Sequence, residues 1–149
     1  MNAHIRLQIY LFLSAVPLHL IWEVTQIKAY DFPETSLTTV AIGCFVPSLG
    51  DGLMTLIIYW VGWVGFRDWQ WVLRPGIRGY LFMMSIGLLL AVAVEWNALY
   101  LTGSWAYSER MFIVPVLGVG FLPVMQMLLL PPVTVLLLQW IWRNRRTVK

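Results

Sequence analysis

The sequence predicts an all-α fold, an integral membrane bundle of four transmembrane helices that forms a single domain over residues 1–149. Its 149 residues are 60% hydrophobic and 11% charged, whereas water-soluble domains have about 45–50% apolar and about 25% charged residues. The apolar residues form four segments, 7–27, 47–66, 79–101 and 123–142. Each has about the 20 residues that a helix needs to cross a bilayer, and six such spans would leave almost no loops.

The first predicted span follows Arg6 and resembles a signal peptide, because an apolar run extends over residues 7–22. A signal peptide ends at a cleavage site with small residues. No convincing site of this kind follows the run, which continues into Glu23 and Gln26. We therefore expect a first span that is retained.

Two shorter apolar segments, 37–46 and 112–122, precede the second and fourth spans. Because each is too short to cross a bilayer alone, we expect re-entrant or interfacial segments before helices two and four. Pro47 and Pro123 stand where these two helices would begin. At the first position of a helix the missing N–H of proline is tolerated.

Basic residues predict the orientation of the bundle, because Lys and Arg are enriched in cytoplasmic loops. Eight of them fall on one side of the predicted spans and two on the other. We therefore expect both termini in the cytoplasm of a multi-pass protein of the cell membrane, such as the bacterial inner membrane. The larger group is Arg6, Arg67, Arg74, Arg78, Arg143, Arg145, Arg146 and Lys149, and the smaller is Lys28 and Arg110.

The charge and the cysteine content argue against several other classes of protein. The net charge of +3 is explained by the basic residues that orient a membrane protein, so we expect no nucleic-acid partner. With Cys44 as the single cysteine, the chain has no internal disulfide and no Cys/His spacing of a zinc, haem or iron–sulfur site. His4 and His19 are too few for a conventional metal cluster. We expect no metal and no cofactor.

A polar residue occurs in each span 16 or 17 positions from the basic residue at its cytoplasmic end. At 1.5 Å per residue, these side chains lie about 24–26 Å above the basic residues. That height is in the outer part of a hydrocarbon layer about 30 Å thick. The polar residues are Glu23, Asp51, Glu95 and Gln126, counted from Arg6, Arg67, Arg78 and Arg143.

Helical spacing indicates which of these side chains turn inwards. Two polar stripes follow the i, i+3, i+4, i+7 pattern of a single helix face and should point into the bundle. In the third span, Glu95 is expected to point inwards and Asn97 towards a neighbouring helix. Trp105 and Tyr107, just beyond this span, could form a lid. The stripes are His19, Trp22, Glu23 and Gln26 in the first span, and Ser48, Asp51, Thr55 and Tyr59 in the second.

Two interpretations compete for this polar layer. Polar side chains join transmembrane helices, at about 0.6–2 kcal/mol for each pair. However, an acid at a helix centre costs about 2.5–3.5 kcal/mol to insert, which favours a functional interpretation for Asp51 and Glu95. For Glu23 and His19 both interpretations stay open. The candidate catalytic residues are Asp51, Glu95 and Glu23, and the candidate substrate-binding residues are His19, Trp96, Asn97, Trp105, Tyr107 and Gln126.

The segment from Glu95 to Tyr107, EWNALYLTGSWAY, resembles a pattern in the membrane carotenoid hydratases and the heterodimeric lycopene cyclases. In that pattern a membrane carboxylate is followed by glycine, then by aromatic-x-Tyr, and then by an apolar helix with proline. The resemblance covers about 30 of the 149 residues. It implies that Glu95 is an acid that protonates a polyene and that Gly103, Trp105 and Tyr107 form the turn after it.

Three functions remain open on the sequence alone. The first is an enzyme or binding protein for an apolar, isoprenoid-like lipid, which uses acid/base chemistry in the outer half of the bilayer. The second is a non-catalytic subunit or assembly factor of a larger membrane complex, and the third is a proton-coupled transporter. We expect membrane lipid as a partner in the first case, and other membrane subunits or further copies of the chain in the others.

Overall fold

The computed structural model describes residues 2–31 and 36–144. Four long helices make up most of this part of the chain: α1 (Ala3–Gln26), α2 (Leu37–Phe66), α3 (Gly76–Trp96) and α4 (Phe121–Asn144). All four are long and apolar enough to cross a membrane. The predicted all-α fold with four spans is therefore confirmed, and the protein is a multi-pass membrane protein. The shorter elements are η1 (Ile27–Ala29), η2 (Trp71–Leu73), the π-helical η3 (Asn97–Thr102), β1 (Ile113–Val114) and β2 (Val119–Gly120).

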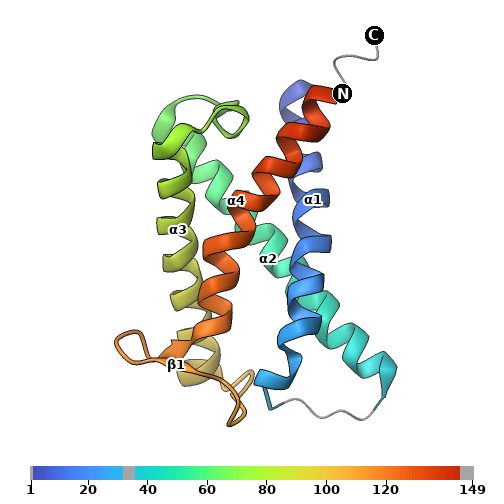
Figure 1. The fold of residues 1–149 in the computed structure, drawn as a ribbon, viewed down its shortest axis with the longest axis vertical. Helices are drawn as coiled ribbons and strands as arrows, with labels where there is room; N and C mark the ends of the chain where they lie inside the picture. The colour runs from blue at the N-terminus through green and yellow to red at the C-terminus, as the bar shows by residue number, and fades with distance from the viewer. Residues whose placement is uncertain (1, 32–35, 145–149) are drawn as a thin grey trace.

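The four helices form a bundle whose two ends differ in chemistry. The beginning of α1, the end of α4 and the connection between α2 and α3 lie at one end (Figure 1). We call it the basic end, and the opposite end, which carries β1 and β2, the hairpin end. The basic end carries Arg6, Arg67, Arg74, Arg78 and Arg143.

Helix α2 corrects the expectation of a separate re-entrant segment over residues 37–46. It runs without interruption from Leu37 to Phe66, and Pro47 lies in its interior. The helix begins where Ser36 Oγ accepts a hydrogen bond from Thr39 N at 3.1 Å, as a capping side chain does. A helix of 30 residues is about 45 Å long. It exceeds the bilayer core of about 30 Å and fits because it crosses the bundle obliquely (Figure 1).

The segment before α4 also differs from a re-entrant helix. Strands β1 and β2 pair antiparallel, with Ile113 opposite Gly120 and Val114 opposite Val119. Gly118 has a φ of 67° at the turn, a conformation that favours glycine. β-Branched side chains favour strands over helices, so this segment forms a hairpin at the end of the bundle.

Helices α3 and α4 approach closely where α4 lacks a backbone donor. Pro131 has no N–H, so the carbonyl of Met127, four residues earlier, has no partner of the usual helical kind. A Cβ on Gly87 of α3 would lie 2.2 Å from this oxygen. Glycine is therefore required for the contact, which fixes α3 and α4 next to each other.

The core near the basic end is closely packed around Trp71. Its indole Nε1 donates to Tyr59 O at 3.0 Å, and the hydroxyl of Tyr59 donates to Trp69 O at 2.9 Å. A Cβ on Gly62 would lie 2.3 Å from Cζ2 of Trp71. Gln139 Nε2 donates to Val72 O at 2.9 Å. The connection between α2 and α3 is thus folded back into the bundle and held by side chain to main chain bonds.

Candidate functional site

Gln126 of α4 joins polar side chains from two other helices. Its Nε2 lies 2.7 Å from Asp51 Oδ2 on α2 and 3.1 Å from Glu23 Oε1 on α1. The same nitrogen lies 3.0 Å from Nδ1 of His19, also on α1. One amide therefore faces three acceptors, although an amide nitrogen carries only two hydrogens.

Gln26 supports this network from the side of the hairpin end. Its Nε2 donates to Glu23 Oε1 at 2.8 Å and to Gln126 Oε1 at 3.1 Å. Its own carbonyl oxygen accepts from Trp22 Nε1 at 3.0 Å. Both polar groups of Gln26 are thus fully used, which fixes the orientation of its amide and of the Gln126 amide beside it.

The tautomer of His19 follows from its neighbours. Thr55 has one hydroxyl hydrogen, which it donates to Asp51 O at 3.1 Å. The hydroxyl oxygen therefore accepts from His19 Nε2, 3.3 Å away. With the hydrogen on Nε2, a neutral imidazole accepts at Nδ1. His19, which is 0% exposed, then takes one of the two hydrogens of Gln126.

Gln126 has too few hydrogens for its three acceptors, although Gln26 supplies Glu23 with a further donor. After its bond to His19, Gln126 has one hydrogen left for Asp51 and Glu23 together. Two carboxylates that share a site rarely both ionise. A proton on one of the two carboxyl groups completes the network, so the geometry favours a carboxyl pair that holds one proton.

Glu95 of α3 lies in a second cluster, which is built from aromatic donors. Its Oε1 accepts from the Tyr30 hydroxyl at 3.2 Å, and its Oε2 accepts from Trp105 Nε1 at 3.2 Å. The Tyr107 hydroxyl also donates to Oε2 and accepts from Gly120 N at 2.7 Å. Three side chains therefore donate to this buried carboxyl group.

The segments that carry these aromatic residues are fixed to each other at the hairpin end. Tyr30 and Tyr107 form an antiparallel bridge, and Asp31 N donates to Ala106 O at 2.9 Å. Burial, and next the Glu95 carboxylate, raise the pKa of Tyr30 and of Tyr107. Both phenols therefore stay neutral at physiological pH and donate to Glu95.

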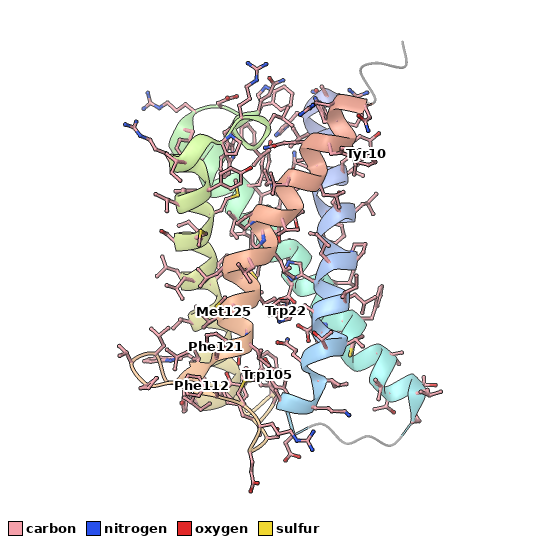
Figure 2. All side chains as sticks on the ribbon, viewed as in Figure 1. Tyr10, Trp22, Trp105, Phe112, Phe121 and Met125 are labelled. Atoms are coloured by element: carbon pink, nitrogen blue, oxygen red, sulfur yellow. The ribbon has the colours of Figure 1, made fainter. Side chains whose placement is uncertain are left out.

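A cavity of about 210 Å³ lies between the two clusters. Glu23, Asp51 and Glu95 all line it, together with Trp105. Most of the remaining lining is apolar, and all four helices contribute to it. Figure 2 shows Trp22 and Trp105 in the half of the bundle nearer the hairpin end, opposite Tyr10. The apolar lining includes Cys44, Pro47, Met54, Ala91, Val94 and Met127.

The structure brings together most of the residues that the sequence singled out. Glu23, Asp51, His19 and Gln126 meet in one network. Glu95, Trp105 and Tyr107 meet in the other. The predicted polar layer thus consists of two groups that face a common cavity, and α3 contributes to only one of them.

Trp96 and Asn97 lie apart from the other predicted site residues, and neither lines the cavity. Trp96 is 52% exposed, and its Nε1 donates to Leu117 O at 2.7 Å. Asn97 is also exposed and begins η3. Successive residues of a helix are rotated by about 100°. With Glu95 turned inwards, the next two side chains point away from the cavity.

Tyr30, Gln26 and Thr55 were not among the predicted site residues, yet they complete the two clusters. Gln26 and Thr55 share the helical stripes of Glu23 and Asp51, so the spacing contained a signal for both. Tyr30 follows the first span in a polar segment without periodicity. Its contact with Glu95 joins residues 65 positions apart, which no local pattern indicates.

In the part of the chain that the structure describes, no three His, Cys, Asp or Glu side chains are grouped as metal ligands would be. No family model matches the chain, and no curated protein or solved structure is significantly similar to it. The functional proposal therefore depends on the geometry of the site.

Proposed function

We propose that the protein is a membrane-embedded enzyme or binding protein for an apolar, isoprenoid-like lipid, on which it acts by acid/base chemistry. The observation that carries this proposal is one largely apolar cavity whose walls carry both the pair of Glu23 and Asp51 and the separate acid Glu95. If the basic end faces the cytoplasm, the cavity lies in the outer half of the bilayer. A largely apolar lining suits a hydrocarbon substrate.

The two acid groups suit opposite steps of a proton transfer. The pair of Glu23 and Asp51 shares the donor of Gln126 and is the source of a proton. Glu95, with its three donors, is the carboxylate that receives one. When the surroundings of two carboxyl groups keep one protonated and the other ionised, the two groups can serve as the acid and the base of an active site.

The proposed reaction is the shift of a carbon–carbon double bond. Asp51 donates its proton to one alkene carbon, and the neighbouring carbon becomes a cation. Glu95 then removes a proton from a carbon next to the cation, so that a new double bond forms. Glu95 releases this proton to solvent and the pair of Glu23 and Asp51 takes one up, which restores the starting state without a co-reactant. Aromatic rings such as Trp105 stabilise a cation over their faces.

The resemblance of residues 95–107 to carotenoid hydratases and lycopene cyclases also supports this proposal. In those families a membrane carboxylate protonates a polyene. We keep this chemistry but assign the proton donor to Asp51 and the base to Glu95. In this chain the acid of the pattern is Glu95, and Trp105 and Tyr107 after it donate to its carboxyl group.

The test measures the exchange of protons with the lipid. Purified protein is incubated in D2O with a series of acyclic isoprenoids, and mass spectrometry reports deuterium on carbon. We expect Asp51→Asn and Glu95→Gln to accumulate normally and to lower the exchange about 10²–10⁴-fold, because each removes a general acid or base. The matched control is Glu109→Gln, an exposed acid of the loop after α3, which should exchange as the wild type does.

Two outcomes would contradict the proposal, and a third would narrow it to the binding protein. Exchange that survives in both amide variants would exclude acid/base chemistry at these residues. Wild-type protein that binds an isoprenoid but exchanges no deuterium would be a binding protein. The non-catalytic subunit or assembly factor would be favoured if the wild-type protein neither binds nor exchanges an isoprenoid and both amide variants have a normal phenotype.

A further inference from the structure

A second cavity, of about 560 Å³, lies at the basic end of the bundle. It lies between the connection from α2 to α3 and the last turns of α4. Its size is within the range of about 300–1,000 Å³ that is usual for ligand sites. The polar residues that line it are Asp68, Gln70, Arg74, Gln139, Trp142 and Arg143.

The two arginines of this cavity carry N–H donors that no carboxylate of the described residues uses in an ion pair. Within residues 2–31 and 36–144, neither Arg74 nor Arg143 forms an ion pair with a carboxylate. The carboxylate of Asp68, at the same cavity, accepts instead from Gln70 N at 2.8 Å. Each guanidinium carries five N–H groups in a fork that matches the oxygens of a phosphate.

Trp142 has a buried N–H beside this cavity. Its side chain lines the cavity and is only 7% exposed. Its buried Nε1 has no hydrogen-bond partner among the described residues, although a buried indole N–H usually has one. The guanidinium of Arg6 lies 5.0 Å from the centroid of the same ring, which adds a third positive charge to this region.

We propose that this cavity binds the phosphate of an anionic lipid headgroup. A phosphate supplies acceptor oxygens for both arginines, and its charge balances theirs. The cavity opens at the end that the basic residues predict to face the cytoplasm, where anionic lipids give the membrane surface its negative potential. This inference does not depend on the chemistry proposed for the first cavity.

The test measures binding of dioleoyl phosphatidylglycerol to the detergent-solubilised protein by native mass spectrometry. We expect Arg74→Gln and Arg143→Gln each to weaken binding about tenfold, because each loses a charge-assisted hydrogen bond. The matched control is Arg78→Gln, which removes the same charge from an exposed residue of the basic end outside the cavity lining, and it should bind as the wild type does.

A competition with inorganic phosphate identifies the source of the ligand. Phosphatidylglycerol that phosphate does not displace supports a site for a lipid headgroup, and displacement by millimolar phosphate supports a site for free phosphate of the same chemistry. Equal losses in Arg78→Gln and Arg74→Gln would show that the basic end attracts lipid only through its general charge. That result, or wild-type affinity in Arg74→Gln and Arg143→Gln, would overturn the proposal.

Discussion

The two halves of the bundle use buried polar side chains in different ways. Near the basic end, Tyr59, Trp71 and Gln139 all donate to main-chain oxygens. Near the hairpin end, Gln126 and Glu95 bond to other side chains. The core of the first half is packed with aromatic rings, and its cavity lies at the end of the bundle. The second half has a cavity of about 210 Å³ among the four helices.

This difference separates polar residues that hold a fold from those suited to chemistry. A side chain that donates to a main-chain oxygen satisfies a neutral acceptor and introduces no charge into the apolar layer. A carboxyl group that is bonded only by other side chains keeps a titratable proton next to a space where a ligand fits. An intramembrane acid is therefore more informative than an intramembrane tyrosine or glutamine.

The largest expected effect is in a test of how the bundle is oriented in the membrane, because a fused reporter gives an all-or-none signal. Fusion of a phosphatase that is active only outside the cytoplasm should give activity at Glu109 and none at Gly76. The eight-to-two division of the basic residues predicts this result. Activity at Gly76 would show that the protein has the opposite orientation, with the acid clusters in the cytoplasmic half of the bilayer.

The next effect is on stability in the half near the basic end. Gly62→Ala would place a Cβ 2.3 Å from Trp71, whereas a Cβ on Gly65 of the same helix would have nothing within 4 Å. We expect Gly62→Ala to destabilise the protein by about 1–3 kcal/mol through overpacking. Thermal unfolding in detergent measures the difference. Gly65→Ala serves as the control, and equal midpoints for the two variants would show that Trp71 has room to move.

A smaller effect concerns the hairpin end at alkaline pH. Burial raises the pKa of Tyr107 above its ordinary value of about 10. The unfolded chain then ionises first, so the stability that Tyr107 contributes is complete below about pH 10 and is lost as the pH rises further. We expect the midpoint of thermal unfolding to fall less between pH 9 and pH 11 in Tyr107→Phe than in the wild type. Parallel curves for the two proteins would contradict burial of this hydroxyl.

The smallest effect distinguishes two tryptophans that are close in sequence. Trp105→Phe removes a donor from Glu95 and should lower deuterium exchange about tenfold, as the loss of one hydrogen bond to a charged group does. Trp96→Phe removes a bond from an exposed residue to Leu117 O and should change the exchange less than about twofold. A larger loss of deuterium exchange in Trp96→Phe than in Trp105→Phe would show that Trp96 belongs to the site.

The sequence by itself determined the number of spans and the inward faces of the first two helices. Continuous apolar segments define membrane helices, because lipid gives a main chain no hydrogen bonds and the helix must satisfy its own. The period of 3.6 residues then placed His19 and Asp51 on buried faces, and both are buried. These properties depend only on residues within a few turns of each other, so they can be predicted from local spacing.

The tertiary structure alone decided which groups meet. The contact of Tyr30 with Glu95 spans 65 positions, and that of Gln126 with His19 spans 107. Such pairs depend on helix tilt and rotation, which packing sets and which spacing does not specify. Tertiary structure also decided the fate of residues 37–46, which the sequence predicted as a re-entrant or interfacial segment. They form the first part of the tilted helix α2, which begins at Leu37. The inward rotation of Glu95 moved Trp96 away from the cavity, because one helix cannot turn two consecutive side chains in the same direction.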